Sequence, residues 1–294
     1  MNTEGYSKQS AVFTALHGYS CYNWCSSGNN LKLGHGAELS SISRNRDQAL
    51  DNYYRDQSAD ASFYNQIGSM ASNIGNIMNE ISGEGGLQSA FYEFFSVVAK
   101  INDDTTDNAY NISSAQEPQD IANQFHQMAN QITNARNESV GELSDLNSFQ
   151  NSKAYLQMEE LNKKFEQLAE INGQIAKSSS QTGSNASLLD QKDLLLDEIS
   201  SIIPVTITQN ENGTSNIYLG NINIIQGGDM KMRFTATQGT SYDEPVIFGI
   251  ENADGSVFDS NINDLLTSGS LAAVGETSEN GTLSYTSVLN DLNT

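Results

Sequence analysis

The chain has 294 residues, with 36 Asp and Glu against 14 Lys and Arg, and a formal net charge of −22. So much negative charge repels phosphate backbones and anionic lipid, which argues against nucleic acid and membranes as partners. No apolar run approaches the roughly 20 residues that span a bilayer, no signal-peptide core follows Met1, and two cysteines do not make a disulfide framework.

Residues 1–43 are expected to be an extended, β-containing start of a helical domain. The run from Gln9 to Leu16 predicts a strand, and the segment from Ala37 to Ile42 predicts a second strand that pairs with it. Because the chain starts inside a turn-like sequence, Asn2–Gly5, we expect it to be a fragment of a longer protein.

Residues 44–203 are almost entirely helix-forming, and we expect them to build a long-helix bundle. The first helix should span Arg44 to Ser82 and end at the glycine-rich run that follows. Its apolar residues recur three and four positions apart, which is the spacing of a seam between packed helices. They are Tyr64, Ile67, Ala71, Ile74, Met78 and Ile81.

A second arm of the bundle starts near Asp107 and continues the same spacing. Pro118 should kink it or mark a fresh helix start, because proline removes a backbone donor. Between Leu146 and Ala154 the stripe lapses, which indicates either a local break or a solvent-exposed helical extension. The stripe runs through Ile121, Phe125, Met128 and Ile132, and resumes at Met158, Leu161, Phe165, Leu168, Ile171 and Ile175.

Two shorter helices complete the predicted bundle. Leu188–Ile203 is amphipathic and is stopped by Pro204. Leu87–Ile101 should plug the bundle with one aromatic side, which is made of Phe91, Phe94, Phe95 and Val98.

After Pro204 the apolar pattern changes to period two, which predicts a small antiparallel β domain over residues 204–268. Asn212–Gly213 is a favoured turn for its first hairpin. Residues 269–294 should be a flexible tail or the start of a further segment, with a helix onset at Ser284–Leu292. The predicted fold class is therefore α+β, an elongated long-helix bundle with a small antiparallel β domain.

Two segments raise the question of a metal site. His17, Cys21, Cys25 and His35 match no common zinc-finger spacing, so the favoured interpretation is a surface loop. A disulfide between the two cysteines would need Cα atoms within about 7 Å. Asn252–Ser256 resembles the start of a calcium loop, but its glycine comes too early and no bidentate Glu follows, which favours a β-turn.

Asp190, Asp193 and Asp197 stand about one helical turn apart. Paired acids can carry out hydrolysis, but a row of acids on an amphipathic helix with no nearby His favours a solvated face. Motifs for a nucleophile elbow, a zinc protease, a P-loop or a dinucleotide fold are absent from the sequence. We therefore expect neither an enzyme nor a cofactor. We interpret Tyr53 and Tyr54 as packing or interface residues.

The segment Asn2–Gln9 reads N-T-E-G-Y-S-K-Q and contains Gly5 and Tyr6. It is similar to the N-T-x-G-Y-S-[RK]-Q signature near the start of the flagellar axial proteins, in particular the family of flagellar hook-associated protein 1.

Three later segments resemble the same family in the same order. Leu168–Ile175 is similar to an I-A-E-L-N-x-x-I run, and Leu188–Glu198, with Asp190 and Asp193, is similar to an L-L-D-Q-R-D-x-L-L-x-E run. The strands that follow, with their glycines near positions 213–228, resemble the next hairpin of the family.

The resemblance implies a structural subunit that is secreted to the extracellular bacterial flagellum and assembles between hook and filament by helix packing. It implies the hook protein and a second hook-associated protein as neighbours, self-association in a ring, and an export chaperone. The coiled-coil segment expected before Asn2 and the long helix expected after the β domain are missing from the sequence, and the region Ser148–Phe165 is longer than the family pattern.

Two further expectations follow from the sequence. If the bundle lacks a returning helix, part of the stripe at Tyr64–Ile81 or Met158–Ile175 is uncovered, and the chain should dimerise. The alternative function is a secreted adhesin or effector that presents a β binding domain on a helical stalk, and a carboxylate-dependent hydrolase is the third reading.

Overall fold

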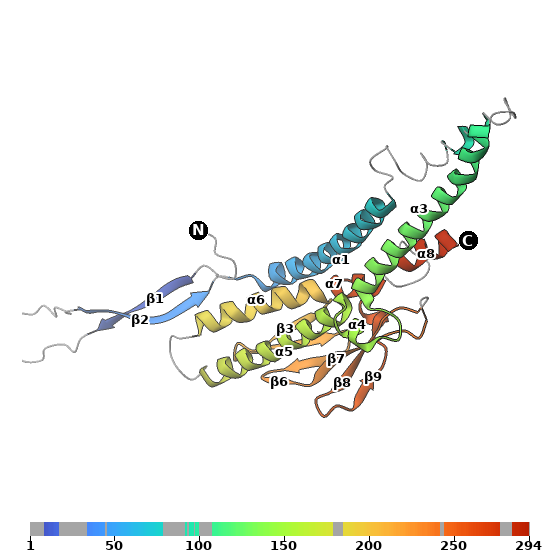
Figure 1. Ribbon diagram of the computed structural model, residues 1–294. Coiled ribbons are helices and arrows are strands. Elements are labelled where there is room, and N and C mark those ends of the chain that lie inside the picture. Colours follow the sequence, from blue (N-terminus) through green and yellow to red (C-terminus); the bar gives the residue numbers. More distant parts are fainter. Residues whose placement is uncertain are drawn as a thin grey trace, which may run out of the picture. The chain divides into compact units, whose positions relative to one another are not determined.

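The computed structural model describes residues 9–17, 34–44, 46–78, 92, 94–96, 98–99, 108–178, 185–241, 244–276 and 284–293. These residues form helices and antiparallel sheets (Figure 1). The predictions for Gly5, Tyr6, Ile81 and the two cysteines lie outside the described residues.

Helix α1 (Gln48–Met78) corresponds to the first predicted arm, and α3 (Asn108–Val140) corresponds to the first part of the second arm. Both lack long runs of β-branched residues, and their apolar residues recur at helical spacing. Pro118 lies inside α3, which neither ends nor restarts there, so the alternative of a fresh helix start is wrong. The helix that was expected to plug the bundle does not do so in its described part, because Phe95 is 62% exposed and Val98 is 42% exposed.

A local break follows α3, as one of the two alternatives at Leu146–Ala154 predicted. The short helix α4 (Leu146–Gln150) begins at Asp145, whose carboxylate accepts hydrogen bonds from the N–H groups of Asn147 and Ser148. This is the usual side-chain solution for the unpaired donors at a helix start. The next helices are α5 (Lys153–Ser178) and α6 (Ala186–Ile202), and α6 ends just before Pro204 as predicted.

The strands form three antiparallel sheets in the described part of the chain. One is the hairpin of β1 (Gln9–His17) and β2 (Gly34–Arg44), as the sequence predicted. The second has the order β3-β4-β5-β6 and the third the order β7-β8-β9. Their strands are β3 (Thr206–Gln209), β4 (Ser215–Leu219), β5 (Ile222–Gln226), β6 (Asp229–Met230), β7 (Met232–Thr237), β8 (Ile247–Asn252) and β9 (Val257–Asp259).

The contacts divide the chain into two compact units. Unit 1 is Met1–Asp56, Lys164–Ile199 and Val205–Lys231, and unit 2 is Gln57–Lys163, Ser200–Pro204 and Met232–Thr294. The strands expected to form one domain over residues 204–268 are thus split, with β3–β6 in unit 1 and β7–β9 in unit 2. The split has a physical cause, because each sheet is hydrogen-bonded to helix residues of its own unit, as described below.

Residues that were expected to be a flexible tail are partly ordered. After the 3-10 turn η1 (Asn263–Leu265), α7 (Ser270–Glu276) buries four consecutive apolar side chains from Leu271 to Val274. Helix α8 (Tyr285–Asn293) occupies the place of the helix onset predicted at Ser284–Leu292, and it packs against α3 (Figure 1). The α+β fold class is confirmed.

Candidate interaction site

The predicted seam of α1 is only partly buried. Ile74 forms a core in unit 2 with Met70, Ile132 of α3 and Tyr285 of α8, and the predicted seam residues Ile67 and Met78 pack against this core. Tyr64 is 71% exposed, so its assignment to the seam is wrong. It stands six positions before Met70, which places it roughly 120° around the helix from the buried face.

The same core bears on the expectation of dimerisation. Ile67, Ile74 and Met78 of the α1 stripe pack with residues of α3 and α8. Leu161, Leu168 and Ile175 of α5 are all at most 1% exposed. Ile171 is half-buried. Apart from Tyr64, the described residues of the strip that was expected to lie uncovered are therefore buried or half-buried, which removes the reason given for a dimer.

Helix α5 is tied to both large sheets by two asparagine side chains. In unit 2, the Phe234 N–H donates to Asn162 Oδ1 at 2.8 Å, and Asn162 Nδ2 donates to the Phe234 carbonyl at 2.9 Å. In unit 1, the Ser215 N–H donates to Asn172 Oδ1 at 3.0 Å, and Asn172 Nδ2 donates to the carbonyls of Ser215 and Gly227, both at 2.8 Å. Each amide supplies hydrogen-bond partners to the backbone of a buried strand residue, Phe234 or Ser215.

These asparagines were not predicted as functional residues, since Asn was assigned to the wet faces. A signal was nevertheless present in the sequence. Asn162 stands four positions after Met158, and Asn172 stands four positions after Leu168, so both lie on the apolar stripe itself. Both are at most 1% exposed.

Two of the three aspartates of α6 are buried and Asp197 is half-buried, which corrects the prediction of a solvated face. Asp190 and Asp193 are each 3% exposed. Arg46 Nη1 lies 3.2 Å from Asp193 Oδ2, and Arg55 Nε lies 2.7 Å from Asp197 Oδ1. The two arginines therefore supply the opposite charge that a carboxylate needs when it is removed from water.

The ionisation of this cluster reflects its burial. Desolvation raises the pKa of Asp197, and the nearby Arg55 and Arg46 oppose the rise. The pKa of Arg46 is raised above its ordinary value; burial works against this, while Asp51, Asp193 and Asp197 together hold the guanidinium charged. Lys192 is also buried, and its ammonium donates to the Gly213 carbonyl at 2.8 Å. Asp51, Asp193 and Asp197 are thus each paired with an arginine.

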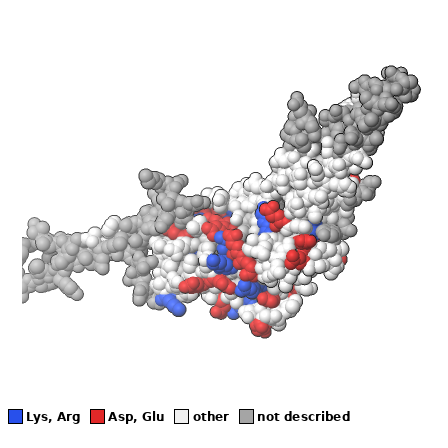
Figure 2. Space-filling model, in the orientation of Figure 1, with Lys and Arg blue, Asp and Glu red and all other residues white. Residues whose placement is uncertain are grey.

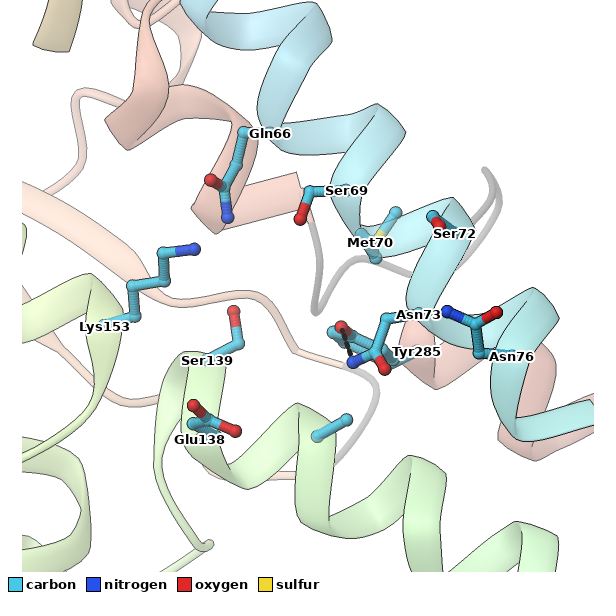
Figure 3. A pocket seen from close by; sticks show the side chains of 11 residues that line it. Gln66, Ser69, Met70, Ser72, Asn73, Asn76, Glu138, Ser139, Lys153 and Tyr285 are labelled. Atoms are coloured by element: carbon cyan, nitrogen blue, oxygen red, sulfur yellow. Dashed lines mark hydrogen bonds between the residues drawn. The ribbon is translucent and has the colours of Figure 1, made fainter.

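A polar hollow of about 460 Å³ lies in unit 2 between α1, α3 and the start of α5 (Figure 3). Figure 3 shows amide and hydroxyl groups of α1 facing Glu138 and Ser139 of α3, with Lys153 at one end. At the other end Asn73 Nδ2 donates to the Tyr285 hydroxyl at 3.2 Å. The side chains that line the hollow can therefore form hydrogen bonds with a polar surface.

An exposed apolar patch lies on α1 in unit 1. Leu50, Tyr53 and Tyr54 are 65%, 64% and 58% exposed. Of the two interpretations given for the tyrosines, packing or interface, their exposure favours the interface. We call these three residues the α1 patch.

Charged side chains of opposite sign lie close together on the surface. Most Lys and Arg atoms on the face shown in Figure 2 lie beside Asp or Glu.

Residues 252–256 form the turn between β8 and β9, with the Ser256 N–H donating to Asp254 Oδ1 at 2.9 Å, as the β-turn interpretation predicted. No set of three His, Cys, Asp or Glu in the described chain could hold a metal ion. No helix among the described residues is long and apolar enough to cross a membrane.

The comparison with known families decides where the chain belongs. Residues 71–294 match the model described as "Flagellar hook-associated protein FlgK helical domain". The chain belongs to the FlgK family. The match covers α3 to α8 with all the strands of both large sheets, so the asparagine ties and the Asp190–Asp197 row lie within the family's helical domain.

Individual FlgK proteins show the same likeness. The chain is 25% identical over 212 residues to flagellar hook-associated protein 1 of Bacillus subtilis, which covers 72% of this chain and 39% of that protein. It is 22% identical over 278 residues to the Escherichia coli protein of the same name, covering 93% of this chain and 46% of that protein. The chain thus spans less than half the length of these relatives.

A solved structure supports the fold. The flagellar hook junction protein FlgK from Burkholderia pseudomallei matches with a TM-score of 0.57 and 19% identity, over 76% of this chain and 38% of that one. At this identity the likeness establishes the fold.

Proposed function

We propose that this chain is part of a structural subunit at the junction between the flagellar hook and filament. The observation that carries the proposal is the family match over residues 71–294. The neighbours we propose are the hook protein on one side and the second hook-associated protein on the other, with copies of the chain arranged in a ring. An export chaperone would bind the subunit before its export to the extracellular flagellum.

The internal ties support a mechanical role. Buried side chains of α5 bond directly to strand backbone at Phe234 and Ser215, so the helix and its sheets resist separation. A junction subunit transmits load and needs such resistance, and we infer that its function is mechanical and not catalytic. The proposed adhesin finds no support in the comparisons, which all name flagellar proteins.

A gene deletion tests the proposal. We expect cells without this chain to build hooks that lack filaments and to release unassembled filament protein into the medium. The intact gene should restore attached filaments, and a copy without the codons for residues 71–294 should not. Filaments that remain attached to hooks in the deletion strain would contradict the proposal.

A further inference from the structure

The turn between β3 and β4 brings together the two groups of an intramolecular reaction. Asn212 is exposed, and Gly213 follows it with a φ of +86°. The backbone nitrogen of the residue after an asparagine can attack the side-chain amide carbon. A glycine at that position favours the attack, because it has no Cβ to shield its nitrogen. The reaction, called deamidation, releases ammonia and leaves a carboxylate.

The amide carbonyl of Asn212 is polarised by two donors. Its Oδ1 accepts the Thr214 N–H at 3.1 Å and the Thr214 hydroxyl at 2.7 Å. Asn210 Nδ2 donates to the same hydroxyl oxygen at 2.8 Å, which leaves the hydroxyl hydrogen for Asn212. Donors aimed at a carbonyl oxygen stabilise the negative charge that develops there when a nucleophile adds to the carbon.

The surroundings also favour the attacking nitrogen. An asparagine side chain that accepts the N–H two residues later closes a small turn around the residue between them, here Gly213. The buried Lys192 donates from its ammonium to the Gly213 carbonyl at 2.8 Å. A positive charge beside this residue favours loss of the proton from the Gly213 N–H, because it stabilises the nitrogen anion that forms.

One hydrogen bond opposes the reaction. The Gly213 N–H donates to the Asn210 carbonyl at 2.9 Å, and this bond has to break before the nitrogen can attack. Local opening of a surface turn requires far less free energy than unfolding of a whole domain. The bond therefore slows the reaction but does not prevent it.

Another Asn-Gly pair in the described chain provides an internal comparison. Asn172–Gly173 lies inside α5, and the Asn172 side chain is fully buried. Its Oδ1 accepts the Ser215 N–H, and its Nδ2 donates to the carbonyls of Ser215 and Gly227. Both amide atoms are held by backbone outside the helix, and the helical backbone holds the Gly173 nitrogen in its own hydrogen bonding. This pair is therefore protected. The pair Asn280–Gly281 lies outside the described residues.

We propose that Asn212 is a site of spontaneous deamidation and that Thr214 is a positioning residue that promotes it. The Gly213 nitrogen gives its proton to water and forms a bond to Asn212 Cγ. The Cγ–Nδ2 bond then breaks, and the nitrogen takes up a proton and leaves as ammonia. Water opens the resulting succinimide ring at either of its carbonyl carbons, which gives aspartate or isoaspartate. The overall reaction consumes water and releases ammonia, without an oxidant or a reductant. The inference goes beyond the proposed function and does not depend on it.

Isoaspartate in this turn would change the packing of unit 1, because it adds a carbon to the main chain. The turn lies against two helices: a Cβ at Gly213 would lie 3.4 Å from Ile175 Cγ2 of α5 and 3.5 Å from Leu189 Cδ2 of α6. Ser215, whose backbone bonds to Asn172, comes directly after the turn. We therefore expect the isoaspartate form to loosen the contact between Ser215 and Asn172.

Peptide mapping of the intact chain during incubation tests the proposal. The folded protein is kept in a mildly alkaline buffer, and samples are digested and analysed by liquid chromatography and mass spectrometry. We expect Asn212 to be converted to both isoaspartate and aspartate, which is the signature of a succinimide, while Asn172 stays unchanged. No conversion at Asn212, conversion to aspartate alone, or conversion of Asn172 at the same rate would overturn the proposal.

Two substitutions of Thr214 test its role. Thr214→Val removes the hydroxyl donor and should slow the conversion of Asn212 several-fold. Thr214→Ser keeps a hydroxyl and should react at nearly the rate of the unchanged chain. Thr208→Val, at an exposed position of β3, is the matched control and should leave the rate unchanged. If Thr214→Val reacts as fast as the unchanged chain or faster, Thr214 does not promote the reaction and its assignment is wrong.

Hydrogen exchange at Ser215 tests the structural consequence. In the aged chain that contains isoaspartate, the Ser215 N–H should exchange faster than in fresh protein. Asn212→Asp adds the same charge without lengthening the main chain, so its Ser215 N–H should exchange at nearly the rate of the fresh protein. Equal exchange in aged and fresh protein would show that the turn absorbs the added carbon, and would overturn the expected loosening.

Discussion

Asn162 on α5 and Phe234 on β7 exchange two hydrogen bonds, of 2.8 and 2.9 Å, in the manner of two neighbouring strands. β7 is an edge strand of its sheet. An open edge exposes unpaired backbone groups that invite pairing with another chain. The asparagine amide satisfies those groups at Phe234, and it does so from a helix.

Replacing Asn162 should therefore destabilise unit 2. Asn162→Ala leaves the buried Phe234 N–H and carbonyl without this partner, so we expect a loss of about 2–4 kcal/mol in the free energy of unfolding. Amide hydrogen exchange at Phe234 should be faster in Asn162→Ala, because the N–H has lost its acceptor. Lys163→Ala, at the exposed neighbouring position, should change the free energy of unfolding by less than about 0.5 kcal/mol. Equal effects in the two variants would show that the amide does not stabilise the sheet.

Two glycines with similar positive φ angles should differ in their tolerance of a side chain. Gly269 and Gly255 have φ of +90° and +83°. A Cβ at Gly269 would overlap the Ile202 carbonyl, with the carbonyl carbon only 2.6 Å away, whereas a Cβ at Gly255 would meet nothing within 4 Å. We expect Gly255→Ala to cost about 1–2 kcal/mol for the left-handed backbone alone. Gly269→Ala should cost about 2 kcal/mol more because of crowding.

Thermal unfolding of the two glycine variants measures this difference. Similar midpoints for Gly269→Ala and Gly255→Ala would mean that the chain near Ile202 yields to the added carbon, and that the close approach has no role in stability.

Much of the fold could be predicted because helical periodicity and chain breakers are local signals. The C-terminal end of α6 follows from Pro204. The hairpin of β3 and β4 follows from the turn residues Asn212–Gly213. Both signals act within a few residues. The burial of Leu161 and Leu168 follows from their spacing in the same way.

The pairing of elements could not be predicted from those signals. Period-two segments after Pro204 look alike in sequence, yet β4 bonds to Asn172 and β7 bonds to Asn162, and the two strands belong to different units. Asp193 looked solvated because its partner, Arg46, lies far away in the sequence. Contacts between residues that lie far apart in the sequence produce no periodic pattern from which they could be predicted.

The ionisation of Asp197 should respond in opposite directions to two neighbouring substitutions. Burial raises the pKa of Asp197, Arg55 lowers it and Asp193 raises it. Arg55→Met should therefore move the pKa of Asp197 further up, and Asp193→Asn should move it down. Carbon-13 NMR of the Asp197 carboxyl during a pH titration measures both shifts. Shifts of the same sign in the two variants would contradict this account.

The pKa of Asp197 also sets the sign of a pH effect on stability. A carboxyl with a raised folded-state pKa holds its proton more tightly in the folded chain than in the unfolded chain. Its favourable contribution is complete below the ordinary value of 3.8 and is lost as pH rises through the folded-state pKa. Asp197→Asn removes this part of the pH dependence, which unfolding in urea across that pH window should reveal as a flatter profile.

The packing of α8 on α3 should depend on Ile132 more than on the Tyr285 hydroxyl. Ile132 is fully buried in the core that joins these helices to α1, so Ile132→Ala should lower the free energy of unfolding by about 2–5 kcal/mol. Tyr285→Phe removes only the acceptor for Asn73 and should cost about 0.5–1.5 kcal/mol. Leu156→Ala, at a side chain that is 54% exposed, is the control for loss of apolar volume and should have little effect. Hydrogen exchange of the α8 amides should be fastest in Ile132→Ala, because the helix loses its main apolar contact. Faster exchange in Tyr285→Phe than in Ile132→Ala would instead show that the hydrogen bond, and not the apolar core, holds α8 in place.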